Sequence, residues 1–242
     1  MPIDRVLNPP SAVKLTVLPD VACPYLPGRV ETLRAVMASR IDGATYQAFM
    51  DAGFRRSGRM IYQPVCRDCR ECRQLRVPTA TFRPTTSQRR CVRKNADLRV
   101  EVGPPELTDE KAALYARYVQ NWHGRPDEGD PDRLREFLYD SPTDSLEFAY
   151  RDPAGRLLAV GLCDLGPASL SSVYFYFDPA DAGRSLGTFG ALHEINWAAG
   201  QGIGYYYLGY WIRDCSAMTY KANFRPAEVL GTDGAWHVLT VQ

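Results

Sequence analysis

The chain has no long apolar run. No part of its 242 residues reaches about 18 consecutive apolar residues, the length that a membrane-spanning helix needs. The opening segment, MPIDRVLNPP, also lacks the apolar core of a secretory signal. We therefore expect neither a signal peptide nor a membrane span. A cytosolic protein is therefore expected. The content of 45% hydrophobic and 24% charged residues is ordinary for a soluble globular chain.

Histidine is scarce as well. The chain has three histidines, and none of them stands near a serine or cysteine in a recognisable nucleophile motif. A hydrolase built on a Ser-His-Asp or Cys-His arrangement is therefore not expected. Internal repeats and low-complexity tracts are also absent, so the length suits one large domain or two small ones with a buried core.

The formal net charge of +1 conceals a strong asymmetry. Residues 55–99 contain 13 Lys or Arg and 3 Asp or Glu, a net +10, so the rest of the chain carries 1 − 10 = −9. Twelve of these 13 cations are arginine, the residue best suited to bidentate phosphate contacts. The block predicts a surface that binds a nucleic acid, with a solvated charged face as the alternative.

The apolar pattern predicts an α+β protein with a mixed sheet. Two regions are expected: a small basic N-terminal module that contains the cysteines (1–104) and a second domain (105–242). The expected helices cover residues 29–40, 45–54, 86–98, 108–123, 130–142, 186–202 and 214–224. The expected strands cover residues 59–65, 73–82, 99–105, 145–152, 156–166, 170–179 and 205–212, with a short strand or hairpin in the tail.

Cysteines cluster in the basic block. Cys66, Cys69 and Cys72 recur every third residue on an expected loop, and Cys23 opens the rigid segment CPYLPGR. In a reducing compartment such thiols are free or bind metal before they form disulfides. This spacing is weaker than a zinc-ribbon pattern, which has a second, distant pair. The four thiols are candidate ligands of zinc or an iron–sulfur cluster, and unligated thiols in a basic loop are the alternative.

Five stretches together resemble the arginyl/leucyl-tRNA–protein transferase family. They read CPYLPGR, GFRRSGRMIYQPVC, VYFYFDP, SLGTFGALHEI and YYYLGYWIRDCSAMTYKANFRPAEVL. The stretches extend over most of the chain, and the last is long and specific. The short length and the single basic N-terminal module look like the bacterial branch, which resembles leucyltransferases that act on N-terminal Asp and Glu.

The resemblance implies a partner and a pathway. Leucine would move from leucyl-tRNA to the α-amino group of proteins with acidic N-termini, which are then degraded by the N-degron route. Leucyl-tRNA and these proteins are the expected partners, and neither a membrane nor DNA is expected. The aminoacyl ester is already activated, so the chemistry itself requires no cofactor.

The order of elements also fits the acyltransferase fold of the Gcn5-related N-acetyltransferases (GNAT). In that fold a strand, a glycine-containing turn and a helix N-terminus bind an anion through backbone N–H groups. Here Arg184, Gly187 and Gly190 give R-x-x-G-x-x-G after the strand VYFYFDP. Two readings from other classes stay open: an acetyl-CoA-dependent acetyltransferase, and a non-catalytic RNA-binding module stabilised by metal. Arginine instead of leucine as the donated residue is a third alternative.

The reaction is attack of an amine on an ester, which needs positioning and hydrogen-bond donors more than a strong base. The predicted catalytic residues are two hydroxyl donors and a base: Tyr210, Tyr220 and Asp214. The predicted substrate-binding residues are cations and one glycine of the family stretches: Arg29, Arg55, Arg56, Arg184, Gly187, Arg213 and Lys221. The predicted tRNA-binding residues are cations in and before the basic helix: Arg83, Arg89, Arg90, Arg93 and Lys94.

Overall fold

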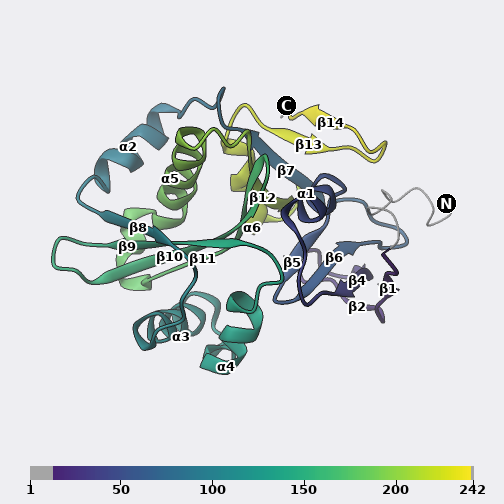
Figure 1. Cartoon of the computed structure of the whole chain (residues 1–242), viewed down its shortest axis with the longest axis horizontal. Helices are drawn as coiled ribbons and strands as arrows, with labels where there is room; N and C mark the ends of the chain where they lie inside the picture. Colours follow the sequence, from purple (N-terminus) through teal and green to yellow (C-terminus); the bar gives the residue numbers. More distant parts are fainter. Residues whose placement is uncertain (1–12, 241–242) are drawn as a thin grey trace.

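The computed structural model describes residues 13–240 and contains two main β-sheets with helices packed around the larger one (Figure 1). In the larger sheet, neighbouring strands are antiparallel except for the parallel pair β11 and β12. The predicted α+β class with a mixed sheet is confirmed. The spatial order of this sheet is β14 (Trp236–Val238), β13 (Glu228–Leu230), β7 (Arg73–Pro78), β12 (Tyr205–Trp211), β11 (Ser169–Phe177), β10 (Leu157–Gly166), β9 (Ser145–Arg151) and β8 (Arg99–Gly103).

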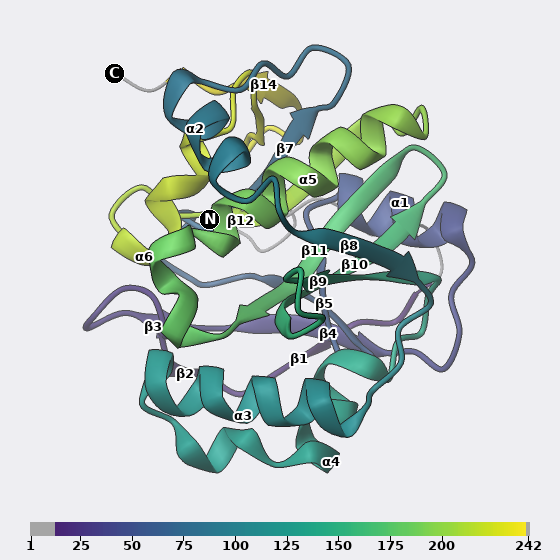
Figure 2. The same cartoon turned by 90° about the vertical axis from the view of Figure 1, so that its left-hand side faces the viewer.

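Helices cover both faces of the large sheet. Figure 2 shows α2 and α5 on one face and α3 and α4 on the other. Within residues 13–240 no helix has the length and hydrophobicity that crossing a membrane would require. The helices are α1 (Gly43–Asp51), α2 (Thr86–Lys94), α3 (Asp109–His123), α4 (Pro131–Leu134), α5 (Leu186–Gly200) and α6 (Ser216–Thr219), with short helical turns η2 (Pro126–Gly129), η3 (Arg135–Tyr139), η4 (Pro179–Arg184) and η5 (Tyr220–Asn223).

The small sheet corrects one predicted element. Residues 29–40, expected as a helix, contain β3 and β4 instead. β4 is paired on both sides, by β1 and by β6, and this pairing outweighs a weak helical pattern. The four strands of the small sheet are, in order, β1 (Thr16–Val17), β4 (Leu33–Met37), β6 (Met60–Pro64) and β5 (Arg55–Ser57), and a separate ribbon is formed by β2 (Val21–Ala22) and β3 (Val30–Glu31).

The two expected regions share one sheet. β7 and β8 lie within residues 1–104, yet both are strands of the large sheet that residues 105–242 otherwise build. β7 pairs with β12 on one side and with β13 on the other. The N-terminal region therefore contributes a strand to the middle of the sheet of the second region, so a boundary at residue 104 cuts through a hydrogen-bonded ladder.

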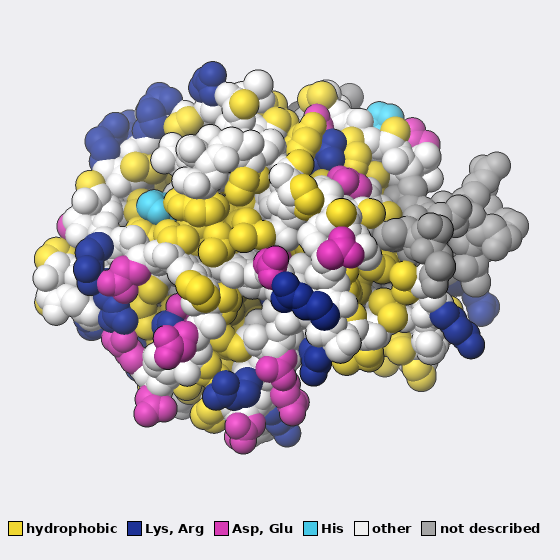
Figure 3. Space-filling view, in the orientation of Figure 1, with side chains coloured by type: hydrophobic (Ala, Val, Ile, Leu, Met, Phe, Trp, Pro, Cys, Tyr) yellow, Lys and Arg dark blue, Asp and Glu magenta, His cyan; other side chains and the backbone are white. Residues whose placement is uncertain are grey.

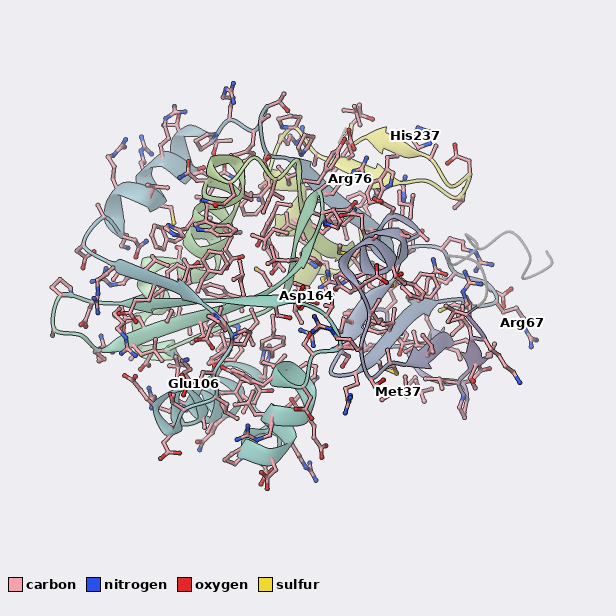
Figure 4. All side chains as sticks on the ribbon, viewed as in Figure 1. Met37, Arg67, Arg76, Glu106, Asp164 and His237 are labelled. Carbon is pink, nitrogen blue, oxygen red and sulfur yellow. The ribbon has the colours of Figure 1, made fainter. Side chains whose placement is uncertain are left out.

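A buried ion pair joins the small sheet to the large one. Arg56 on β5 donates from Nε to Asp164 Oδ2 (2.7 Å) and from Nη2 to Asp164 Oδ1 (2.9 Å). Asp164 on β10 also accepts from the hydroxyls of Tyr46 and Ser145, each at 2.6 Å. Figure 4 places Asp164 at the junction between the large sheet and β5. A fully enclosed pair with this many hydrogen bonds holds the two sheets in one relative position.

A second buried carboxyl lies where α5 crosses the sheet. Glu194 is 1% exposed and accepts hydrogen bonds from the hydroxyls of Tyr206 and Tyr150 and from the thiol of Cys163. Burial raises the pKa of Glu194 to about 7, because its three donors only partly replace water. Among the described residues no cation forms an ion pair with it, so ionisation of Glu194 works against the fold.

Replacing Arg56 with methionine is expected to destabilise the protein by about 3–5 kcal/mol, because it leaves the buried Asp164 carboxylate without a cation. The measurement is the free energy of unfolding by denaturant titration. Arg40→Met is the matched control: its pair with Asp144 is 2.7 Å long but both side chains are mostly exposed, so a loss of under about 1 kcal/mol is expected. Equal losses in the two variants would contradict the structural role of Arg56.

The raised pKa of Glu194 predicts that the stability of the protein depends on pH. Its pKa is higher in the folded protein than in the unfolded chain, so its contribution to stability falls as pH rises from about 4.5 to about 7. A shift of this size corresponds to roughly 3 kcal/mol. The difference in free energy of unfolding between wild type and Glu194→Gln, measured from pH 5 to pH 8, should move in favour of the variant as pH rises. A difference that does not change with pH would show that Glu194 does not titrate in this range.

Candidate active site

The parallel strands β11 and β12 are paired over only part of their length. Residues 169–171 of β11 pair with residues 205–207 of β12, and the pairing then stops, although the strands continue to Phe177 and Trp211. The pairing of β12 with β7 shifts register between Tyr207 and Gly209 at the same level. Beyond this point the facing backbone groups of the two strands can accept a side chain or a ligand.

Arg55 of β5 lies where this pairing stops. Its Nη1 donates to Ser171 Oγ (3.1 Å), and its Nη2 donates to the backbone oxygen of Ser172 (2.6 Å). Gly209 on β12 has a φ of 80°, and a Cβ placed there would be 2.9 Å from Arg55 Cζ. Glycine is needed at this position both for the positive φ and for the close approach of the guanidinium.

Lys221 lies beside the next residue of β12. Its side chain is buried, and Nζ donates to the backbone oxygen of Tyr210 (2.7 Å). Burial and then the charge of Arg55 lower the pKa of Lys221 to about 7. Two of the predicted substrate-binding cations, Arg55 and Lys221, are thus brought together by β5, β12 and η5.

A pocket of about 520 Å³ lies at Tyr220, the residue that precedes Lys221. Its walls come from the start of α2, the start of α5 and the segment η5, and Tyr220 belongs to both the pocket and the neighbourhood of Arg55. Partial burial raises the pKa of Tyr220, so its hydroxyl stays protonated and can donate a hydrogen bond. The lining residues are Thr85, Ser87, Gln88, Cys91, Ser185, Thr188, Tyr220, Asn223, Phe224 and Arg225.

The N-terminus of α5 faces this pocket. Ser185 precedes the helix in a left-handed conformation (φ 56°) and makes no side-chain cap. The first backbone N–H groups of a helix have no partner within it, so those at the start of α5 are available to an anion or an oxyanion. A Cβ at Gly187 would meet nothing within 4 Å, which leaves open space at this end of the helix.

Cations also lie along α2, the helix that contributes Ser87, Gln88 and Cys91 to the pocket wall. Figure 3 shows Lys and Arg side chains along the outer surface of α2. Arg90 and Arg93 are exposed and make no ion pair among residues 13–240. Arg89 donates to the backbone oxygen of Pro84 (2.6 Å), and Lys94 donates to that of Gly183. The predicted tRNA-binding cations of this helix therefore form one surface. Arg83, also exposed, donates to the backbone oxygen of Phe82 (2.7 Å) just before the helix.

Part of the basic block lies away from this surface. Arg67, in the cysteine loop, projects from the opposite side of the molecule (Figure 4). Arg76 is stacked between the rings of Tyr205 (3.8 Å from Cζ to the centroid) and Trp236 (4.0 Å) and pairs with Glu228 (2.7 Å). The net charge of residues 55–99 therefore overstates the number of cations that one ligand could contact.

Three predicted site residues have other roles in the structure. Arg56 is used in the buried pair with Asp164 and does not reach the pocket. Arg184 donates to both carboxylate oxygens of Asp97 at 3.0 Å, which ties η4 to the segment after α2. The buried Tyr210 hydroxyl donates to the backbone oxygen of Gly53 (2.9 Å). Arg56 and Tyr210 are buried, and a polar group that is buried must find its partner within the protein. Arg184 is half-buried and is held by its ion pair with Asp97. Substrate contacts by Arg56 and Arg184 and a catalytic role of Tyr210 stay predictions.

Three others lie at the surface. Arg29 is exposed and donates to the backbone oxygen of Asp68 (3.3 Å) in the cysteine loop. Arg213 is exposed, with Cζ 6.0 Å from the ring centroid of Trp211. Asp214 is exposed and is not part of the pocket wall. Substrate contacts by Arg29 and Arg213, and a role of Asp214 as a base, stay predictions.

The four candidate metal ligands lie near one another. Burial, followed by the charges of Cys66, Cys69 and Cys23, raises the pKa of Cys72 to about 12. All seven cysteines of the chain are free of disulfides. Within residues 13–240, however, no three or more Cys, His, Asp or Glu side chains are arranged so that they could hold a metal ion. The thiols as they lie do not fit a formed metal centre, and the expected zinc or iron–sulfur site stays a prediction.

Sequence reasoning missed several residues around Arg55 and the pocket. Ser171 and Ser172 hold the guanidinium, and neither belongs to a recognisable motif. Gly209 could have been recognised from the sequence, because a glycine inside an aromatic strand indicates a bulge or a close backbone approach. Thr188 and Asn223 are ordinary polar residues, and only the fold brings them into one wall.

Solved structures with similar folds include L-PGS from Bacillus licheniformis, with a TM-score of 0.48 and 13% identity over 69% of this chain and 50% of that chain. FemX is also similar, with a TM-score of 0.44 and 11% identity over 70% of this chain and 60% of that chain.

Sequence relatives are far more similar. A protein of Halorhodospira halophila named aspartate/glutamate leucyltransferase is 40% identical over 88% of this chain and 92% of its own length. A Pseudomonas putida protein of the same name is 40% identical over 86% of this chain and 90% of its own length. Residues 21–90 match the N-terminal part, and residues 110–231 the C-terminal part, of the family described as arginine-tRNA-protein transferase. The chain belongs to the arginine-tRNA-protein transferase family.

Proposed function

We propose that this protein transfers leucine from leucyl-tRNA to the α-amino group of proteins that begin with Asp or Glu. The observation that carries the proposal is the likeness over most of the chain to relatives named aspartate/glutamate leucyltransferase. In the cell, this transfer would mark the acceptor protein for degradation by the N-degron route that the family resemblance implies.

The proposed step replaces an ester by an amide. The nitrogen of the acceptor attacks the leucyl carbonyl carbon, and the bond from that carbon to the terminal ribose oxygen breaks. The amine loses a proton and the ribose hydroxyl gains one, so no net proton is consumed. A free α-amine has a pKa of about 7.7–8.0, so part of it is neutral at physiological pH. A strong base is therefore not needed, and positioning can supply most of the acceleration.

The pocket supports binding of the donor end. Most of its lining residues carry a hydroxyl, amide or guanidinium group that could bind the terminal ribose and its phosphate, and Phe224 lies among them. The start of α5 offers backbone N–H groups near Gly187 that can stabilise the negative oxygen formed as the amine attacks. The hydroxyl of Tyr220 is a second donor in the same wall.

The α2 surface supports contact with the tRNA backbone. Arg90 and Arg93 extend into solvent next to the pocket wall formed by Gln88 and Cys91. Arginines in this setting bind phosphates electrostatically, and such binding weakens steeply as salt rises. If the terminal ribose of the tRNA lies in the pocket, the adjoining tRNA backbone would extend along α2.

The deciding experiment measures transfer of labelled leucine from charged tRNA to peptides beginning with Asp, Glu or Ala. Transfer to the two acidic peptides and not to the Ala peptide is expected. Charged arginyl-tRNA in parallel reactions distinguishes arginine as the donated residue. Acetyl-CoA in place of the tRNA tests the acetyltransferase alternative, and its use as a donor without tRNA would contradict the proposal, as would the absence of leucine transfer when a control transferase is active.

The double variant Arg90→Ala/Arg93→Ala is expected to raise the KM for leucyl-tRNA with little change in the KM for the peptide. Because two phosphate contacts are lost, the slope of log KM against log salt concentration should fall by about 1–2. Arg135→Ala is the matched control, since Arg135 is an exposed arginine beyond α4, on the face of the sheet opposite α2. A similar change in this control would mean that the effect is general electrostatics and not a tRNA surface on α2.

A further inference from the structure

Arg55 and Lys221 lack the counter-charge that enclosed cations normally have. Arg55 donates to a hydroxyl and a backbone oxygen, and Lys221 donates to a backbone oxygen. Among residues 13–240, no carboxylate oxygen lies within 4.0 Å of either group. Lys221 is buried and Arg55 is half-buried. The buried cations Arg56 and Lys111 differ, because Arg56 pairs with Asp164 and Lys111 with Glu147. Keeping a charge on the buried Lys221 beside Arg55 without an anion is costly, which is why the pKa of Lys221 is lowered, and a bound anion would restore that charge.

The two cations flank consecutive residues of β12. The guanidinium of Arg55 lies against Gly209, and Nζ of Lys221 lies at the backbone oxygen of Tyr210. Gln74, directly opposite Tyr210 on β7, is 1% exposed, and neither atom of its amide has a hydrogen-bond partner. The buried amide of Gln74 has no partner, and Gln74 pairs with the strand residue whose backbone oxygen accepts from Lys221, so this part of the sheet has unused hydrogen-bonding capacity for a ligand.

Tyr220 connects these cations to the donor pocket. It precedes Lys221 in the chain, it lines the pocket, and it is 45% exposed. The charge of Arg55 acts on its hydroxyl and partly offsets the effect of burial on the pKa of Tyr220. An anion held by Arg55 and Lys221 would therefore lie near Tyr220, a residue of the pocket wall.

We propose that Arg55 and Lys221 form the subsite for the side-chain carboxylate of the acceptor's first residue, an assignment that rests on the transferase function proposed above. The carboxylate supplies the missing negative charge, and the α-amine of the same residue is then held near Tyr220 and the donor pocket. The two cations select for charge, because a neutral amide of the same shape cannot neutralise them.

The subsite can be tested by binding alone, without any tRNA. Two peptides of identical sequence that begin with Asp or with Asn, each labelled with a fluorophore at the C-terminus, are titrated with the full-length protein, and fluorescence anisotropy gives the dissociation constants. Wild type is expected to bind the Asp peptide about tenfold more tightly, or better, because a charge-assisted contact is lost with Asn. Lys221→Met and Arg55→Gln should each weaken binding of the Asp peptide and leave binding of the Asn peptide nearly unchanged.

Two further variants make the result specific. Arg55→Lys keeps the charge and should retain part of the preference for Asp. Arg40→Gln removes an exposed arginine outside the site and should retain all of it. Thermal unfolding of each variant identifies those that fold, and if Arg55→Gln does not, Lys221→Met decides the question. Retention of the full Asp preference in Lys221→Met, or its loss only in Arg213→Gln, would overturn the assignment.

The possible outcomes test the proposed subsite and the proposed transferase function independently. If wild type prefers the Asp peptide and the variants lose that preference, the subsite stands whether or not leucine is the residue transferred. If wild type transfers leucine to acidic peptides and the variants do so with an unchanged KM for the peptide, the function stands and the subsite is wrong. Equal binding of the Asp and Asn peptides by wild type also refutes the subsite.

Discussion

The ion pair between Arg56 and Asp164 joins β5 of the small sheet to β10 of the large one, and the geometry of the site depends on it. Neighbouring side chains of a strand point to opposite sides. When Arg56 is held by Asp164, Arg55 is therefore directed to Ser171, Ser172 and the point where β11 and β12 cease to pair. An arginine on a flexible loop would need ordering on binding, whereas this one is placed by the fold.

The site has two parts, and Tyr220 lies near both. One is the pocket formed by α2, η5 and the start of α5, where backbone N–H groups are available. The other is the pair Arg55 and Lys221, which come from different elements and have no carboxylate partner among the described residues. This division suits a reaction that joins two large molecules through a small reacting centre. Placement of the ester and the amine relative to each other accounts for catalysis better than any single strong acid or base.

The sequence predicted the architecture better than the site. The apolar pattern of the sequence located the helices α2, α3 and α5 and the strands β10 to β12. The short strand β4 was read as a helix because its neighbours in the sheet are distant in the chain. The sequence motifs made Arg55 and Lys221 candidate substrate-binding residues, but they made Arg56 and Arg184 candidates as well. Only the fold distinguishes a cation with an internal carboxylate from a cation without one.

β7 lies between β12 and β13, two strands that come from the other end of the chain. During synthesis, β7 leaves the ribosome long before its partners are made, and both of its edges stay open in the meantime. Open strand edges are templates for pairing with other chains. Arg73, Arg76 and Pro78 make this strand a poor template, since charge and proline both disfavour pairing at an edge. These residues thus protect the nascent chain from such pairing until β12 and β13 are made and pair with β7.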